Sequence, residues 1–257
     1  MPSVDCPGCG GTGWVVIVKS GVSCAERCEC FARDRVRQVE NSAGLPPLYQ
    51  TASIENFQLP RDNPIAERGL TNALMMVRAY AREFPRLEKP GLLLIGEPGT
   101  GKTHLAVAAF RILMSRGFEG LFCDYQSLLD KIRAGYDTSS GASDKEAYRT
   151  ALDAEILLLD DLGAHRVTDW VEDTVTSLIT HRCNHRKPVI ATTNLTDPDA
   201  SGPASSSAFS SGGGKSFDLR NTLAERIGMR ARSRLFEMCR VIRMPQVEDY
   251  RLRKRLQ

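Results

Sequence analysis

The sequence predicts an α/β protein whose parallel sheet is covered by helices on both faces, with a small cysteine-bearing unit before it. Short, continuously apolar runs such as 92–95 and 156–159 alternate with longer segments of helical periodicity, a pattern typical of buried parallel strands. Five of the eight cysteines lie within the first thirty residues. A unit that small needs a staple, because it cannot bury a sufficient core alone.

The elements are expected in a definite order along the chain. Residues 1–40 form the small unit, with a short charged helix over 31–40, and 41–57 is predicted as a linker. The main domain, 58–257, begins with a helix over 65–84 that places Leu70, Leu74, Val77 and Ala81 on one face. Strands are then expected over 92–95, 121–124, 156–159 and 189–192, and helices over 102–116, 126–134 and 170–183.

Two segments have the composition of flexible chain. Residues 137–143 are short and polar, and 197–216 are rich in Ser, Gly and Ala, so the latter is expected to be a flexible insertion within the main domain.

Composition and charge narrow the classes of function. Hydrophobic residues at 42% and charged residues at 25% are ordinary for a globular protein. No signal-peptide pattern or bilayer-length apolar run is present, so a cytoplasmic location without membrane contact is expected. The net charge is only +3, yet residues 219–257 hold eleven basic and four acidic side chains. Such a segment suits a polyanion, although a solvated basic helix would have the same composition.

The strongest motif is GEPGTGKT at 96–103, which matches G-x-x-x-x-G-K-[ST] between a strand and a helix. Its glycines let backbone amides cradle phosphates at a helix N-terminus. Lys102 is expected to reach the β- and γ-phosphates, and Thr103 to ligate Mg²⁺. The sequence therefore predicts an ATP site made by Gly96, Glu97, Pro98, Gly99, Thr100, Gly101, Lys102 and Thr103.

Two further strands end in polar residues on the same side of the predicted sheet. Asp160 and Asp161 follow the apolar run 156–159, and Asn194 follows the strand 189–192. Ligands of α/β sheets bind at the carboxyl ends of strands. We expect Asp160 to hold Mg²⁺, Asp161 to activate the attacking water as general base, and Asn194 to orient that water or the γ-phosphate.

The cysteine cluster has metal-ligand spacing. Cys6 and Cys9 form a C-x-x-C knuckle, and the second pair is either Cys28 with Cys30 or Cys24 with Cys28. Because no histidine precedes His104, a site here must consist of four cysteines. Thiolates favour Zn²⁺ over harder cations, with an iron–sulfur cluster as the alternative.

Several motifs together resemble one family over nearly the whole chain. They are GEPGTGKTH at 96–104, LLLDDLG at 157–163, the segment 47–57, ERI at 225–227, SRL at 233–235 and DYR at 249–251. In this order they resemble the DnaC/DnaI helicase loaders and the related IstB proteins, within the AAA+ ATPases. The insertion 197–216 departs from the family pattern, in which that connection is usually short.

The resemblance implies a fold, an activity and partners. It implies an AAA+ P-loop three-layer parallel sheet without a clear C-terminal lid, and adds His104 to the ATP-binding motif. ATP hydrolysis is expected at the seam between neighbouring subunits, completed by an arginine finger, which is Arg234 by position or else Arg226. Arg251 is a possible second nucleotide-sensing arginine.

Similar loaders carry a C-x-x-C…C-x-C arrangement, which favours Cys6, Cys9, Cys28 and Cys30 as zinc ligands. The implied function is an ATP-dependent helicase loader in DNA replication. Its expected partners are a DnaB-like replicative helicase, single-stranded DNA and further copies of itself. The alternatives are an IstB-like transposition helper acting on duplex DNA and a nucleotide-switched adaptor with little hydrolysis.

Overall fold

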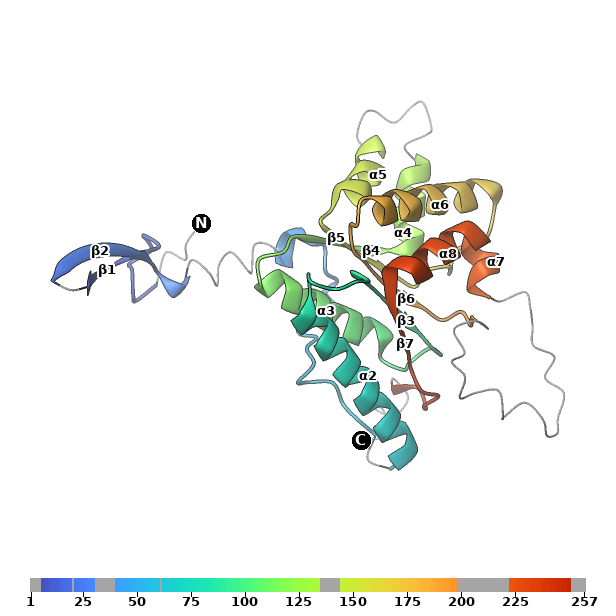
Figure 1. The fold of residues 1–257 in the computed structure, drawn as a ribbon, viewed down its shortest axis with the longest axis horizontal. Helices are drawn as coiled ribbons and strands as arrows, with labels where there is room; N and C mark the ends of the chain where they lie inside the picture. Colours follow the sequence, from blue (N-terminus) through green and yellow to red (C-terminus); the bar gives the residue numbers. More distant parts are fainter. Residues whose placement is uncertain are drawn as a thin grey trace.

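The structure, a computed structural model, describes residues 6–19, 21–30, 40–60, 62–134, 144–197 and 222–250. Figure 1 shows a small N-terminal hairpin standing away from a larger body of helices around one sheet. Antiparallel strands β1 (Trp14–Lys19) and β2 (Val22–Arg27) form the hairpin. No helix among these residues is long and apolar enough to cross a membrane.

The larger body is built on a sheet of five parallel strands in the order β4-β5-β6-β3-β7. They are β3 (Gly91–Ile95), β4 (Gly120–Asp124), β5 (Ile156–Asp160), β6 (Val189–Thr193) and β7 (Cys239–Arg243). Every residue of the three central strands β5, β6 and β3 is buried. This explains why they are continuously apolar rather than alternating, since both faces of the sheet are covered.

Helices cover the two faces of the sheet, which makes three layers (Figure 1). Leu92 and Leu94 pack in the core formed with α2 (Pro64–Glu83) and α3 (Lys102–Ser115). Leu93 and Ile95 point into the core on the opposite face. The helices of that face are α4 (Tyr125–Ala134), α5 (Asp144–Asp153), α6 (Asp169–Asn184), α7 (Leu223–Ile227) and α8 (Met229–Met238). The predicted α/β class with a parallel sheet is confirmed.

Residues 41–57, predicted as a linker, instead pack on the main body. Their buried side chains are Ala43, Leu45, Ala52 and Ile54, in the same core as α2 and α3. Arg111 donates from Nη1 to the carbonyl of Ala52 at 2.8 Å, and the Phe122 amide donates to the Ala43 carbonyl at 2.7 Å. The prolines and glycine that suggested a linker surround a single 3-10 turn, Pro47–Tyr49.

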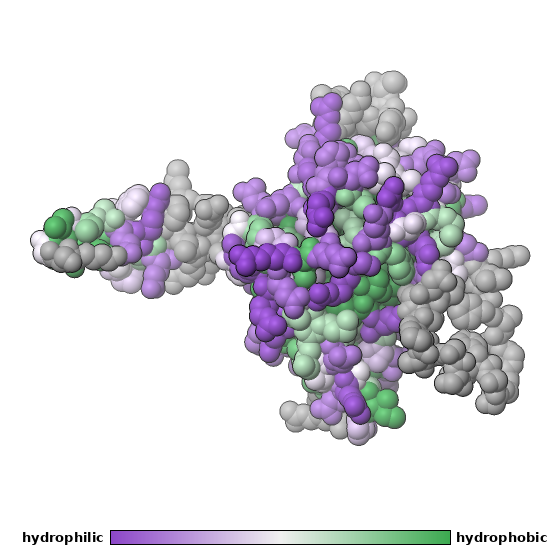
Figure 2. All heavy atoms as spheres, viewed as in Figure 1, coloured by the Kyte–Doolittle hydropathy of each residue, from purple (hydrophilic) through white to green (hydrophobic). Residues whose placement is uncertain are grey.

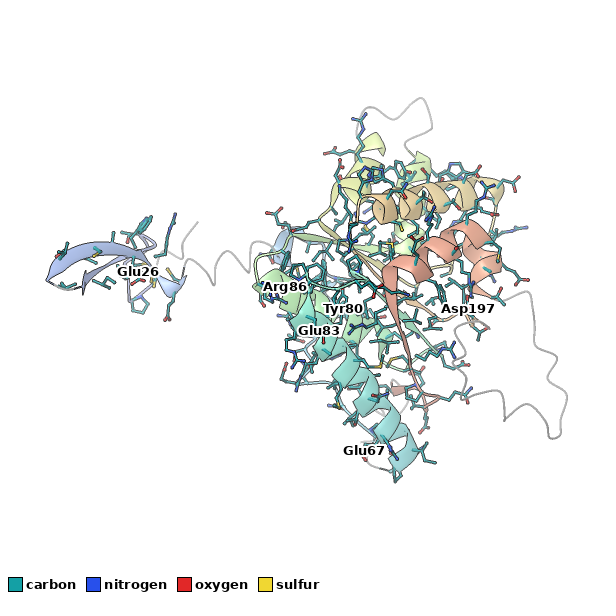
Figure 3. All side chains as sticks on the ribbon, viewed as in Figure 1. Glu26, Glu67, Tyr80, Glu83, Arg86 and Asp197 are labelled. Atoms are coloured by element: carbon teal, nitrogen blue, oxygen red, sulfur yellow. The ribbon has the colours of Figure 1, made fainter. Side chains whose placement is uncertain are left out.

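Residues 222–250 of the basic C-terminal region form part of the fold rather than an isolated basic helix. They include α7, α8 and the edge strand β7, whose Cys239 and Ile242 are buried while Arg243 is exposed. Arg240 forms a 3.1 Å ion pair with Glu83 of α2, labelled in Figure 3. Charged side chains are common on edge strands, where one side of the strand faces solvent. Because its arginines interrupt the apolar pattern, this strand was not predicted from the sequence.

Asp197, labelled in Figure 3, was predicted as the first residue of the flexible insertion, but it is buried. Its carboxylate accepts a hydrogen bond from Nε of Arg232 at 2.7 Å, so this aspartate anchors the end of the segment after β6 to α8. The remaining residues 198–216 lie outside the described residues, as do 137–143, Arg251 and the predicted helix residues 31–39.

Candidate functional site

The loop between β3 and α3 has a backbone conformation suited to binding an anion. Gly99 and Gly101 have positive φ angles of 74° and 89°, which glycine adopts without steric cost. Gly101 caps α3, so the unpaired amides of the helix N-terminus face this loop. Lys102 is buried, and its Nζ donates to the carbonyl of Glu97 at 2.8 Å.

Asp160 lies between two hydroxyl groups at the end of β5. Its Oδ1 accepts a hydrogen bond from Thr103 Oγ1 at 2.9 Å and another from Thr192 Oγ1 at 2.6 Å. Burial raises the pKa of Asp160, the two hydrogen bonds lower it, and the neighbouring Asp161 charge raises it. Thr103 and Asp160 present adjacent oxygens from two motifs, a donor set that fits Mg²⁺.

Asp161 follows in an unusual backbone conformation, with a φ of 54°. Such a conformation costs a non-glycine residue about 1–3 kcal/mol, and surrounding contacts must maintain it. Asn194 Nδ2 donates to Asp161 Oδ1 at 3.1 Å, which brings the two predicted catalytic side chains into contact.

A cavity of about 790 Å³ brings these residues together. Its wall includes Pro98, Gly99, Gly101, Lys102, Thr103, His104, Asp161 and Asn194. Gly96, Glu97, Thr100 and Asp160 stand in the same loop or strand end but do not line it. The side chain of His104 donates from Nε2 to the Ser53 carbonyl at 2.8 Å and packs edge-on against Phe57. A volume of this size is typical of small-molecule sites.

The far wall of the cavity comes from residues that sequence reasoning did not assign to the site. They are Leu48, Tyr49, Thr51, Ala52, Asn56, Gln58 and Tyr250. The sequence did single out the segment 47–57 and the motif 249–251, but only as features of the family. That resemblance was the one sequence signal that could have pointed to their place at the cavity. Their place at the cavity depends on the packing of 41–57 against α3, which a linker would not show.

The C-terminal strap, residues 244–250, runs along the phosphate-binding loop. The Met244 amide donates to the Ile95 carbonyl at 2.8 Å, and the Tyr250 amide donates to the Gly99 carbonyl at 3.1 Å. Tyr250 Oη also donates to Gln58 Oε1 at 3.1 Å. A side chain in place of Gly99 would collide with the Asp249 carboxylate. The positive φ angle of Gly99 favours glycine there, and a larger residue would also displace the Asp249 side chain.

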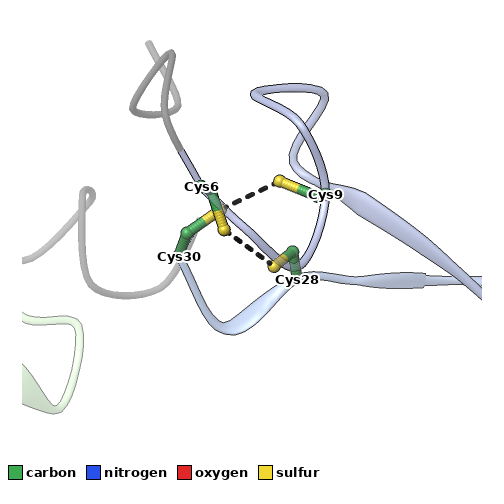
Figure 4. A group of neighbouring side chains, drawn as sticks. All are labelled: Cys6, Cys9, Cys28 and Cys30. Carbon is green, nitrogen blue, oxygen red and sulfur yellow. Dashed lines mark hydrogen bonds between the residues drawn. The ribbon is translucent and has the colours of Figure 1, made fainter.

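In the hairpin, the sulfur atoms of Cys6, Cys9, Cys28 and Cys30 all lie within 4.8 Å of one another (Figure 4). The Cys6–Cys28 and Cys9–Cys30 sulfur separations are 3.7 and 3.4 Å. Four sulfurs each about 2.3 Å from a tetrahedral zinc would be about 3.8 Å apart, so the group fits Zn²⁺. Cys24 is outside this group, and its Sγ donates to the Val22 carbonyl at 3.4 Å.

Two of these thiols, Cys9 and Cys30, have shifted pKa values. Burial opposes ionisation, but hydrogen bonds from Cys30 and from the Gly13 amide lower the pKa of Cys9 to about 6. Burial raises the pKa of Cys30. Thiolate is the form of cysteine that binds metal, so the lowered pKa of Cys9 favours metal binding.

The two candidate finger arginines, Arg234 and Arg226, do not line the cavity described above. Arg234, on α8, lines an open groove between α6 and α8 together with Arg230 and Thr176. It also forms an exposed 2.7 Å ion pair with Glu237. Arg226, on α7, packs beside Gly163, and neither arginine lines the cavity of its own chain.

The family model described as IstB-like ATP binding protein matches residues 29–199. The replicative helicase loader DnaC of Escherichia coli (strain K12) is 25% identical over 160 residues, which cover 62% of each chain. The matched region therefore spans about three fifths of the length of this curated relative.

Solved structures give the same picture. The crystal structure of the DnaC helicase loader is similar with 28% identity and a TM-score of 0.60, covering 78% of this chain and all of that one. The crystal structure of DnaI, at 20% identity, has the same fold, with a TM-score of 0.57 over 81% of this chain and 97% of that one.

Proposed function

This chain belongs to the IstB-like ATP binding protein family, and we propose that it hydrolyses ATP to drive the loading of a replicative DNA helicase. One observation supports hydrolysis above all: Lys102, Thr103, Asp161 and Asn194 line the same cavity. Asp160 adjoins this group, because its carboxylate accepts a hydrogen bond from Thr103. The similarity to DnaC supports the loader role.

The residues would divide the chemistry of hydrolysis among them. Backbone N–H groups of the loop 97–103, other than Pro98, which has none, would bind the phosphates together with the ammonium of Lys102. Thr103 and Asp160 would hold Mg²⁺, which supplies positive charge beside the phosphate oxygens. Asp161 accepts a proton from the attacking water, and Asn194 orients the Asp161 carboxylate through their 3.1 Å hydrogen bond.

The N-terminal unit, residues 1–40, is proposed as a zinc-binding domain that recognises the helicase. Zinc held by Cys6, Cys9, Cys28 and Cys30 would staple a hairpin too small to be stable alone. Val16, Val18 and Val22 are each more than 60% exposed on that hairpin, and Figure 2 shows the apolar patch at its tip. An exposed apolar patch of this kind is a feature of protein-binding surfaces.

Assembly would complete the ATP site. An arginine that lies away from its own cavity, as Arg234 does, can act on the nucleotide of a neighbouring subunit. ATP-dependent homo-oligomers would then present the basic α7–α8 region together, which suits single-stranded DNA.

The test is ATP turnover by the full chain, with and without single-stranded DNA and a DnaB-like helicase, and with Lys102→Ala as the control. We expect turnover by the wild type, none by the variant, and ATP-dependent co-purification of the helicase. Tight ATP binding without turnover would instead support the nucleotide-switched adaptor.

The family description favours a second candidate, an IstB-like transposition helper. That protein would act on duplex DNA with a transposase as its partner. Stimulation of turnover by duplex rather than single-stranded DNA, with no helicase bound, would decide for it.

A further inference from the structure

Thr192, near the end of β6, contacts both acidic residues at the end of β5. Its side chain is completely buried. The hydroxyl donates to Asp160 Oδ1 at 2.6 Å and accepts from the Asp161 backbone amide at 2.9 Å. A hydroxyl can donate and accept at the same time, which no apolar side chain of that size can do. Thr192 does not line the cavity itself.

The same residue maintains the unusual backbone of Asp161. Besides its side-chain contact to the Asp161 amide, Thr192 accepts the Leu162 amide at its own carbonyl, at 2.8 Å. The backbone amides of Asp161 and of the next residue, Leu162, thus both donate hydrogen bonds to Thr192. These two bonds flank the left-handed φ of 54° at Asp161. This backbone directs the Asp161 carboxylate toward Asn194 and the cavity. Non-glycine residues keep such conformations only where neighbouring contacts impose them.

Asp160 is restrained in a comparable way from the other side. Its Oδ1 accepts from Thr192 and from Thr103 of the phosphate-binding loop. One carboxylate oxygen is thus placed between the loop and β6. Hydrogen bonds of this kind, made to a metal-binding carboxylate by a residue behind it, orient the carboxylate.

We propose that Thr192 is the positioning residue of the ATPase site, orienting Asp160 toward Mg²⁺ through its hydroxyl and Asp161 toward the attacking water through the backbone. The inference rests on the proposed ATP hydrolysis. It adds that the Mg²⁺ and water roles share one hydroxyl group.

Thr193 provides a matched control one residue further along. It is equally buried, but its hydroxyl donates to the Leu162 carbonyl at 2.8 Å and contacts neither carboxylate nor the Asp161 amide. Thr192→Val and Thr193→Val remove the same atom from the same strand. Their comparison separates the loss of a buried hydroxyl from the loss of this particular pair of contacts.

The experiment measures three quantities for wild type, Thr192→Val, Thr192→Ser and Thr193→Val. These are the turnover number, the ATP affinity at saturating Mg²⁺ and the Mg²⁺ concentration for half-maximal binding of a fluorescent ATP analogue. For Thr192→Val we expect turnover to fall by about 10- to 100-fold, and the Mg²⁺ requirement to rise about tenfold. ATP affinity at saturating Mg²⁺ should change by less than about threefold, because the phosphate contacts remain. Thr192→Ser should restore most of both losses.

A double variant tests the route through Asp161. Thr192→Val combined with Asp161→Asn should hydrolyse ATP little more slowly than Asp161→Asn alone. Positions that act through the same group are not additive. Both variants are compared at saturating Mg²⁺, where a weaker Mg²⁺ affinity at Asp160 no longer limits turnover. Losses that multiply under this condition would contradict the route through Asp161.

The proposal is overturned if Thr192→Val keeps its turnover and its Mg²⁺ requirement within about twofold of wild type. The two lost hydrogen bonds would then have no orienting effect on the carboxylates. Equal losses in Thr193→Val, or no recovery in Thr192→Ser, would also overturn it. If Thr192→Val does not fold, Thr192→Cys replaces it, because a thiol is only a weak donor. If the wild type does not hydrolyse ATP, the proposed function fails, while the Mg²⁺ titration still decides the role of Thr192.

Discussion

Two neighbouring carboxylates end β5, and their surroundings differ. Asp160 is buried, with an exposed fraction of 9%, and burial raises its pKa. Asp161 is half-buried and lines the cavity. A carboxylate restrained by two hydroxyls suits a cation, whereas one that faces the cavity suits proton transfer to and from water. Adjacent residues can therefore perform different roles at the same strand end.

At the residue scale, Asp161→Asn should retain ATP binding and lose turnover. General base catalysis is worth about 10²- to 10⁴-fold, and an amide of the same shape cannot accept the proton. Single-turnover hydrolysis and equilibrium ATP binding measure the two effects. Asp169→Asn, which changes an exposed acid at the start of α6, serves as the control. Turnover that stays at the wild-type level would remove the general-base role from Asp161.

At the scale of elements, Arg182 of α6 joins three parts of the fold. Its side chain is fully buried. The guanidinium donates to the carbonyls of Ala151, Leu152, Ala154, Glu155 and Pro188. These carbonyls lie at the end of α5, before β5 and before β6. Burial lowers the pKa of Arg182 to about 10, so the group remains charged at neutral pH.

Replacing Arg182 should therefore lower stability rather than activity. In Arg182→Ala each buried carbonyl left unpaired costs about 1–3 kcal/mol, so we expect a loss of at least about 3 kcal/mol. Arg182→Lys should retain only part of the stability that Arg182→Ala loses, because an ammonium has three donors and lacks the planar fork of a guanidinium. Denaturant unfolding gives both values. Arg78→Ala, which removes an exposed ion pair with Glu55, should cost less than about 1 kcal/mol. A similar small cost for Arg182→Ala would contradict the joining role.

At the scale of the whole molecule, the hairpin stands apart from the larger body (Figure 1), whose residues line the cavity of the proposed ATP site. Metal binding and ATP binding should therefore be separable functions. The hairpin depends on the four cysteines for its core, whereas the cavity depends on the sheet and the segment 41–57.

The untagged protein should contain about one zinc per chain. Cys6→Ser and Cys9→Ser should lose the metal and the helicase, yet bind ATP as the wild type does. Cys24→Ser should keep the zinc, because that sulfur lies outside the four-cysteine group. Elemental analysis, ATP titration and helicase pull-down give the three readouts. A metal-free wild type that still binds the helicase would refute the zinc proposal.

Assembly is tested by subunit mixing. Arg234→Ala should bind ATP but lose hydrolysis, by up to about 10³- to 10⁵-fold for an arginine finger. Lys102→Ala lacks ATP binding but retains the arginine. Mixing the two variants can form a complete site at one seam, so activity should partly return. Arg230→Ala, which removes another arginine of the same groove, is the control. If mixed subunits assemble and remain inactive, Arg234 is not the finger, and Arg226 becomes the residue to test.

Local patterns were sufficient for much of this protein. The apolar strands, the helix over α2, the phosphate-binding motif and the acids after β5 can all be read from consecutive residues. The reason is physical: continuous burial needs continuous apolar sequence, and an anion-binding turn needs its glycines at fixed spacing. The same patterns predicted a relation to the DnaC and IstB proteins, and the family match and the similar DnaC structure confirm it.

Other features depend on contacts between residues far apart in the chain. The segment 41–57 looked like a linker because its polar and proline residues are local signals, whereas its burial depends on α2 and α3. The strand β7 was not predicted, because Arg240 is charged and its ion-pair partner Glu83 lies far away in the sequence, on α2. Thr192 read only as the end of a strand. Its role emerges when β6 lies beside β5, because hydrogen bonds between neighbouring parallel strand ends are made by tertiary folding and leave no periodicity in the sequence.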